Sequence, residues 1–138
     1  MKVAVRYFTR SGNTEKLAHA IAEAVGVEAK DISVPLEEKT EILFLGSSVY
    51  AAGVDDAVKR FVAENKDRIG KLYNFSTAAL IASTYKQVQK LAAENGIDMA
   101  EEEFHCRGSF TVLHKGRPNA EDLQNAADFA EKVVGRSL

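Results

Sequence analysis

Short apolar segments and amphipathic segments alternate along the whole chain, and this alternation limits the folds open to it. The apolar segments have the length of strands, whereas the others repeat apolar residues at the three- and four-residue spacing of a helix. Strands that alternate with helices imply a parallel sheet with helices on both faces. We therefore predict a three-layer α/β protein organised as a single domain over residues 1–138.

The pattern predicts five strands and four helices. Strands are expected at residues 2–8, 27–32, 41–46, 72–79 and 103–110. Helices are expected at residues 13–25, 56–69, from a cap at 83 or 84 to 96, and 119–135. The segment between residues 32 and 41 is too short for a crossover helix, so we expect a turn there. Right-handed crossovers then bring the carboxyl ends of the strands to one edge, where ligands bind.

The turn between the first strand and the first helix is rich in hydroxyl and amide groups. It consists of Thr9, Arg10, Ser11, Gly12, Asn13 and Thr14. A helix N-terminus offers backbone N–H groups to an anion, and a glycine lets the backbone approach it closely. The turn has neither the lysine of a nucleotide-triphosphate loop nor the repeated glycines of a dinucleotide loop. It therefore predicts a monoester phosphate site, although the same residues are also good helix caps.

The string T-x-S-G-N-T at residues 9–14 resembles the phosphate loop of short-chain flavodoxins. The resemblance covers essentially the whole chain. Ala18 and Ile21 agree with the wider family pattern, whereas Arg6 stands where an aliphatic or aromatic residue is usual. The resemblance implies a flavodoxin-like fold with a five-stranded parallel sheet in the order 2-1-3-4-5. It also implies noncovalent flavin mononucleotide (FMN), with its phosphate held by residues 9–14.

The resemblance places the flavin ring between the loops that follow the third and fourth strands. The first loop contributes Ser47, Ser48, Val49, Tyr50, Ala51 and Gly53, and Tyr50 is suited to stack on the ring. The second loop contributes Ser76, Thr77 and Ala78, whose backbone can reach the pyrimidine edge. This second loop has no glycine and no acidic run, and a second stacking partner is not evident. The alternative interpretations are that Tyr50 is an ordinary loop tyrosine and that the second loop is only a connector.

Two further features have alternative interpretations. Asp55 and Asp56 follow the first loop, where negative charge would lower the potential of a bound flavin. They are equally the acids of a helix first turn. Arg6 lies within a central strand, and a buried arginine needs a partner. We expect a structural ion pair with Asp31 or Glu41 on a neighbouring strand.

Composition excludes several classes of protein. The net charge is −2 without a basic stripe, so nucleic-acid binding is not expected. No apolar run approaches the ~18 residues of a membrane span. The single cysteine, Cys106, fits a reducing compartment and a place in the core, so a cytoplasmic protein is expected. The three histidines are scattered, and neither a metal site nor catalytic side chains are predicted.

Three functions remain open at this point. The first is an FMN-binding electron-transfer protein, a monomer or weak dimer that serves a redox partner protein or a small-molecule acceptor. The second is an FMN-dependent reductase, for example of quinones with NAD(P)H, which the modest net charge favours slightly. The third is a flavodoxin-like module that has lost its flavin, which the glycine-free second loop keeps open.

Overall fold

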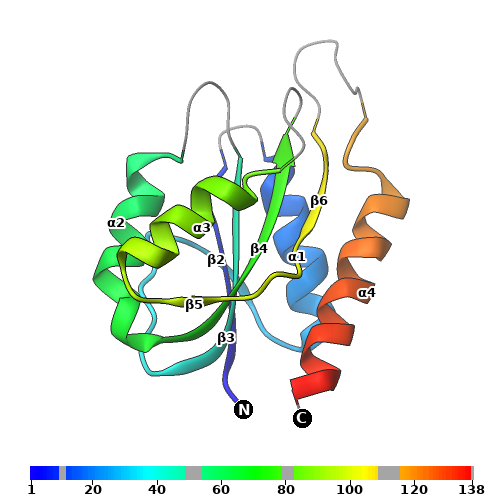
Figure 1. Ribbon diagram of the computed structural model, residues 1–138. Coiled ribbons are helices and arrows are strands. Elements are labelled where there is room, and N and C mark those ends of the chain that lie inside the picture. Colours follow the sequence, from blue (N-terminus) through cyan, green and yellow to red (C-terminus); the bar gives the residue numbers. More distant parts are fainter. Residues whose placement is uncertain (10–11, 49–53, 79–82, 109–115, 138) are drawn as a thin grey trace.

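One parallel sheet runs through the centre of the molecule (Figure 1). The computed structural model describes residues 1–9, 12–48, 54–78, 83–108 and 116–137. The strands are β1 (Val3–Tyr7), β2 (Ala29–Asp31), β3 (Thr40–Ser48), β4 (Ile69–Ala78), β5 (Asp98–Met99) and β6 (Phe104–Arg107). Their order is β2-β1-β3-β4-β5, and β6 also pairs with β4. Every pair is parallel, which confirms the predicted order 2-1-3-4-5.

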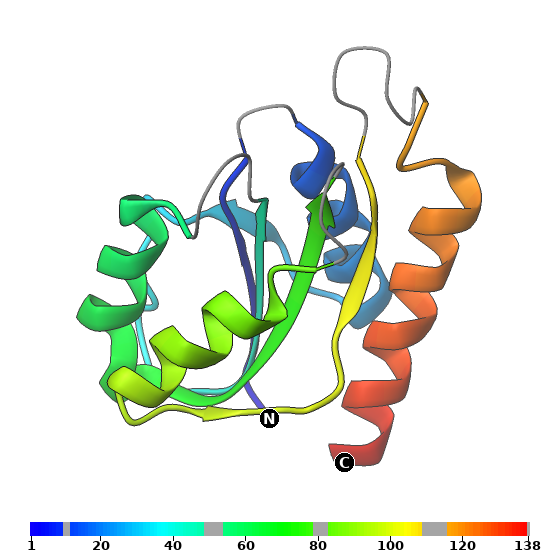
Figure 2. The ribbon, with the colours of Figure 1, turned by 45° about the horizontal axis from the view of Figure 1, so that its top comes forward.

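Two pairs of helices cover the two faces of the sheet (Figure 2). The helices are α1 (Asn13–Val25), α2 (Asp56–Asn65), α3 (Tyr85–Glu94) and α4 (Ala120–Ser137). The α1 and α4 helices enclose one hydrophobic core, which includes Phe44 and Phe75. The α2 and α3 helices enclose the other, which includes Leu43 and Leu72. The three-layer architecture is therefore confirmed.

The first helix follows directly from its apolar spacing. Leu17, Ala18 and Ile21 are fully buried, because residues three and four apart share one face of a helix. Gly26 adopts a left-handed φ of 75° and ends the helix, as its C-terminal position predicts. The predicted bounds of 13–25 are confirmed.

Other boundaries differ from the predictions. The α2 helix ends at Asn65, whose side chain accepts from Leu36 N and donates to Phe61 O. A short 3-10 turn at Lys66–Arg68 then leads into β4. The prediction that Gly135 ends the last helix is wrong, because α4 continues to Ser137. An exposed glycine without a left-handed backbone does not by itself end a helix.

The edge of the sheet beside β4 is built from two pieces. The predicted strand at 103–110 corresponds to β6, which spans Phe104–Arg107, and β5 precedes it as a two-residue pairing. Residues 109 and 110 lie outside the described residues. Cys106 packs in the α1/α4 core with Phe104, as alternation along the strand predicts.

Arg6 is buried on β1, with 6% of its surface exposed. Its Nε donates to Val34 O at 2.9 Å and its Nη2 to Pro35 O at 3.2 Å. Its Nη1 donates to Val5 O at 3.1 Å. The guanidinium therefore ties the connection after β2 to the sheet. Burial lowers the pKa of Arg6, and the nearby Glu37 opposes that shift.

The predicted ion pair of Arg6 with Asp31 or Glu41 is wrong. Asp31 accepts from Ser33 N at 2.8 Å, and Glu41 accepts from Lys2 N at 2.6 Å. Both carboxylates are thus engaged by nearby backbone. The predicted turn between β2 and β3 is confirmed, since no helix forms there. Such a turn leaves carbonyl oxygens without helical partners, and Arg6 satisfies two of them.

The N-terminus of α4 is closed by a reciprocal pair of hydrogen bonds. Asp122 N donates to Asn119 Oδ1 at 2.9 Å, and Asn119 N donates to Asp122 Oδ2 at 2.8 Å. Arg117 binds both oxygens of the Asp122 carboxylate through Nε at 2.5 Å and Nη2 at 2.7 Å. The hydrogen bond from Arg117 holds the pKa of Asp122 below its ordinary value, against the effect of burial, and the Asn119 N–H adds to the lowering.

Replacing Asp122 with asparagine is expected to lower the free energy of unfolding by about 1 kcal/mol at pH 7. Because the folded-state pKa is depressed, the wild-type advantage is present above the unfolded-state pKa near 4 and is lost as the pH falls further. Urea denaturation at pH 7 and pH 3 measures both values. Glu131→Gln, at an exposed position of α4 beyond its first turn, should change neither. An Asp122→Asn loss of equal size at both pH values would contradict the assignment.

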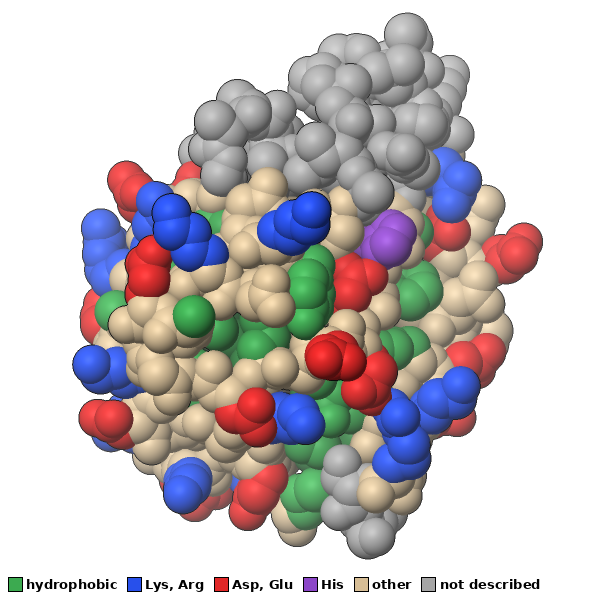
Figure 3. All heavy atoms as spheres, in the orientation of Figure 1, with side chains coloured by type: hydrophobic (Ala, Val, Ile, Leu, Met, Phe, Trp, Pro, Cys, Tyr) green, Lys and Arg blue, Asp and Glu red, His purple; other side chains and the backbone are tan. Residues whose placement is uncertain are grey.

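The surface carries charges of both signs. Figure 3 shows Lys and Arg side chains intermingled with Asp and Glu over the face that carries α2 and α3. Among the helices of the described residues, none is long and apolar enough to cross a membrane.

Candidate functional site

The turn after β1 leads into the N-terminus of α1. Gly12 has a left-handed φ of 87°, and its N–H donates to Thr9 Oγ1 at 3.0 Å. No neighbour crowds the position where a Cβ would lie, so the backbone angle is what requires glycine here. The α1 helix starts at the next residue, and the first N–H groups of a helix have no helical carbonyl to bind. This arrangement offers backbone donors to an anion.

Two side chains of this turn are buried against the carboxyl end of the sheet. Thr14 is completely buried, and its Oγ1 lies 2.9 Å from Thr77 Oγ1 on β4. Asn13 is 5% exposed, and a Cβ on Gly108 would lie only 2.9 Å from its Nδ2. The ends of β1, β4 and β6 therefore meet at the start of α1. The contact uses one of the two hydroxyl protons, and the other has no acceptor among the described residues, so it can donate to an anion.

A second group of polar side chains is buried at the ends of β3 and β4. Ser47, Asn74, Ser76 and Thr84 are each at most 1% exposed. Thr84 lies at their centre: its Oγ1 accepts from Ser47 Oγ at 3.3 Å and from Asn74 Nδ2 at 3.2 Å. Its backbone N–H donates to Ser76 Oγ at 3.3 Å. A buried polar network of this kind is stable only when its members are satisfied.

This network fixes the approaches to both predicted loops. Ser47 precedes residues 49–53, and Thr84 follows residues 79–82. The sequence predicts Thr84 only as a helix cap, and Asn74 is not among the predicted site residues. One sequence feature indicates this buried network: Asn74 is a polar residue inside the apolar run Leu72–Phe75 of a central strand.

The predicted site residues are thus divided between the two polar groups. The first contains Thr9, Gly12, Asn13, Thr14 and Thr77, and the second contains Ser47 and Ser76. Ser48 and Ala78 end β3 and β4. Arg10, Ser11, Val49, Tyr50, Ala51 and Gly53 lie outside the described residues, so the geometry neither tests nor uses them.

The two acids after the first loop belong to the start of α2. Asp55 is its N-cap and accepts from Ala57 N at 2.9 Å, while Asp56 lies in the first turn. The interpretation of both as helix-terminal acids is confirmed. An influence on flavin potential stays a prediction.

Cys106 is a buried thiol at the side of β6 that faces α4. Burial raises its pKa to about 12, and Asp122 adds to the shift while Arg117 opposes it. The thiol is therefore protonated at neutral pH and is a poor nucleophile. The predicted role as a small core residue is confirmed.

Comparison with known families matches residues 4–109 to the family described as "Flavodoxin domain". The match runs from the second residue of β1 to just beyond β6 and includes both groups of buried polar residues. The chain belongs to the flavodoxin family. The resemblance inferred from the string at residues 9–14 is thereby confirmed.

Three similar proteins place this flavodoxin-family chain among known ones. An uncharacterized protein of Methanocaldococcus jannaschii is 26% identical over 136 residues, which cover 88% of this chain and 90% of that protein. A flavodoxin from the domain Archaea shares the fold with a TM-score of 0.81, at 18% identity, over 99% of this chain and 98% of that one. A flavoprotein of Lactobacillus acidophilus, solved in complex with FMN, has a TM-score of 0.62 at 16% identity over 77% of this chain and 92% of that one.

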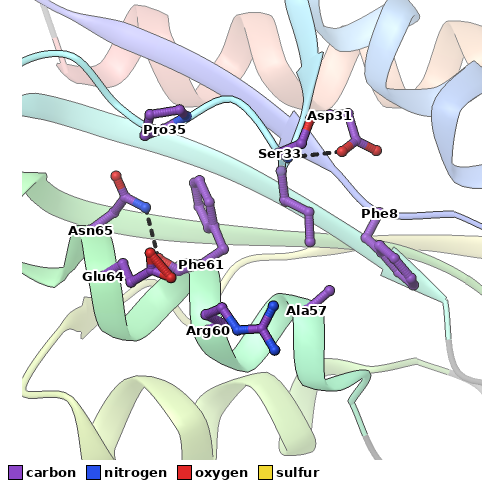
Figure 4. A pocket seen from close by; sticks show the side chains of 10 residues that line it. Phe8, Asp31, Ser33, Pro35, Ala57, Arg60, Phe61, Glu64 and Asn65 are labelled. Atoms are coloured by element: carbon purple, nitrogen blue, oxygen red, sulfur yellow. Dashed lines mark hydrogen bonds between the residues drawn. The ribbon is translucent and has the colours of Figure 1, made fainter.

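This member of the flavodoxin family also has a pocket of about 440 Å³ between α2 and the connection after β2 (Figure 4). Phe8 and Phe61 contribute apolar walls, and Arg60 points into the space between them. Asp31 and Glu64 add negative charge to the same lining. The pocket lies on the α2 face of the sheet, whereas α1 starts on the opposite face. Among the described residues, those of the turn at 9–14 are not part of its lining.

Proposed function

We propose that this chain binds FMN noncovalently and transfers electrons. The observation that carries the proposal is the polar turn at the start of α1, which is linked to β4 by the Thr14–Thr77 contact of 2.9 Å. The proposal is supported by membership of the flavodoxin family and by the FMN in the Lactobacillus acidophilus flavoprotein.

The residues of the turn suit a phosphate. Its proposed ligands are the backbone and side chains of Thr9, Arg10, Ser11, Gly12, Asn13 and Thr14. Hydroxyl, amide and helix N-terminal N–H groups all donate to anionic oxygen. Glu15, the acid in the first turn of α1, has its Oε2 at 3.3 Å from His19 Nε2, one helical turn farther along α1. The two side chains are 59% and 44% exposed, so this surface contact contributes little.

The proposed ring site lies between the two loops. Its residues are Ser47, Ser48, Val49, Tyr50, Ala51 and Gly53 on one side and Ser76, Thr77 and Ala78 on the other. The network around Thr84 supports the proposal because it joins the end of β3, where the first loop begins, to the end of β4, where the second loop begins. Bound FMN would supply the electron-transfer chemistry, while these residues bind and orient it. We propose that the protein acts in the cytoplasm as a monomer or weak dimer.

Titration of the purified protein with FMN, followed by flavin fluorescence, tests the proposal. We expect saturable quenching at one flavin per chain. Changing both Ser11 and Thr14 to alanine should weaken binding by at least about tenfold, because hydrogen bonds to a charged group are each worth roughly 1.5–3 kcal/mol. Failure of the wild-type protein to bind at tens of micromolar FMN would overturn the proposal and leave a flavodoxin-like module without flavin.

Two control variants separate the phosphate contact from general damage. Ser33→Ala removes an exposed hydroxyl from a different loop and should bind FMN like the wild type. Thr14→Ser keeps the hydroxyl that faces Thr77 and should retain most of the affinity. Circular dichroism of each variant checks that it is folded.

The reductase alternative is favoured by one observation. The net charge is only −2, and charges of both signs are intermingled on the α2/α3 face, so this face lacks the strongly acidic character of many electron carriers. Steady-state oxidation of NAD(P)H with a quinone distinguishes the two functions. Rapid turnover would establish the enzyme, and transfer only to a redox protein would establish the carrier.

A further inference from the structure

The broken edge strand brings an acidic side chain toward the second proposed flavin loop. Asp98 pairs with Lys71 and Phe104 pairs with Phe75, so six positions on the edge span four positions on β4. The extra residues fall between β5 and β6. Glu103 lies in this insertion, directly before β6, and its side chain is only 15% exposed.

The Glu103 carboxylate bridges two side chains from different parts of the chain. Its Oε1 accepts a hydrogen bond from Ser83 Oγ, 20 residues away in sequence. Its Oε2 lies 2.5 Å from Nδ1 of His105, which is 45% exposed. Ser83 Oγ in turn accepts from Tyr85 N at 3.0 Å. Glu103 therefore holds the residue at which the chain enters α3 after residues 79–82.

We propose that Glu103 is a positioning residue for FMN binding and that His105 makes this positioning depend on pH. The inference rests on the proposed function, because the loop that Ser83 ends is the second proposed flavin loop. With His105 protonated, the contact is a charge-assisted hydrogen bond, which is roughly twice as strong as a neutral one. Loss of that proton leaves the carboxylate less firmly held. FMN affinity is therefore expected to fall as the pH rises through the range in which histidines titrate.

The neighbouring groups assign the effect to His105. From α3, the Tyr85 hydroxyl faces this region and donates to Ala100 O at 3.0 Å. Burial raises the Tyr85 pKa, and Glu101 and Glu103 raise it further, so the phenol stays neutral across this range. On β4, the residue paired with His105 is Ser76, which does not titrate there. Glu102, on the same segment as Glu103, is paired with Arg136 of α4.

The test measures FMN affinity at pH 6 and pH 8 in wild type and in matched variants. The FMN phosphate itself titrates near pH 6. The quantity compared between proteins is therefore the ratio of the FMN dissociation constant at pH 8 to that at pH 6. His105→Gln should reduce the wild-type ratio by about threefold, within the range of a partly exposed ion pair. His19→Gln removes another exposed histidine paired with a glutamate and should leave the ratio unchanged. Glu103→Gln should weaken binding at pH 6 and also lose the extra pH dependence.

A measurement on the wild-type protein needs no variant. Binding that depends on the protonation of His105 must in return shift the titration of His105. We expect FMN to raise the NMR titration midpoint of this imidazole and to leave that of His19 in place. If FMN binds but neither His105→Gln nor the His105 titration shows an effect, the positioning proposal is overturned and the proposed function stands. If wild type does not bind FMN at either pH, the proposed function itself fails.

Discussion

Replacing Gly46 with alanine is expected to lower the free energy of unfolding by about 3 kcal/mol. Gly46 pairs with Phe75 between neighbouring central strands, and the Phe75 ring lies over it. A Cβ at position 46 would be 2.2 Å from Cε2 and 2.3 Å from Cζ of that ring. Phe75 is completely buried, so the ring has no free volume into which to move. Urea denaturation measures the change.

Gly135→Ala is the matched control for this prediction. Gly135 lies in α4, and nothing is within 4 Å of the position of its Cβ. An alanine there should raise the free energy of unfolding by roughly 0.5–1 kcal/mol, because alanine is the better helix former. Equal stability of the Gly46 variant and wild type would show that the ring over Gly46 can be displaced.

Replacing Arg6 with methionine is expected to lower the free energy of unfolding by about 2–3 kcal/mol. Methionine fills similar space but cannot donate to Val34 O or Pro35 O, and leaving these part-buried carbonyls without a donor is costly. Arg6→Lys should recover only part of the loss, since an ammonium cannot reproduce the planar fork. The guanidinium does not titrate between pH 5 and 9, so the loss should be constant over that interval.

Arg68→Met provides the comparison for Arg6. Arg68 is exposed in the turn before β4, and its replacement should change the free energy of unfolding by less than about 0.5 kcal/mol. Comparable effects of the two substitutions would mean that the hydrogen bonds of Arg6 contribute little.

The order of the sheet and the polar turn could be predicted because both follow from local patterns. Helical spacing fixed the bounds of α1, and a strand followed by a hydroxyl-rich turn placed the start of that helix. The partners of Arg6 could not be predicted, because they are backbone carbonyl groups. Every residue carries one, so the residue types do not indicate which carbonyl accepts. β5 has only two residues, which are too few to show the alternation of a strand. The last residues of α4 are likewise too few to show helical spacing.

The buried contacts of the site depend on distance in sequence. Thr14 meets Thr77 across 63 residues, and Ser83 meets Glu103 across 20. No local spacing encodes such pairs, which are set by how the strands align in the sheet. From the sequence, Thr14 and Thr77 can each be predicted as a ligand. Only the fold shows that the two side chains meet at the start of one helix.

Both borders of the sheet are poor templates for a strand from another molecule. On one side, β2 offers only three residues, and Lys30 lies at their centre. On the other, the gap between β5 and β6 interrupts the row of backbone donors and acceptors, and three consecutive glutamates, residues 101–103, fall in that gap. Short, charged and interrupted edges resist the growth of intermolecular sheets. Copies of this chain, even when crowded, should therefore meet through helices and loops and not by extending the sheet.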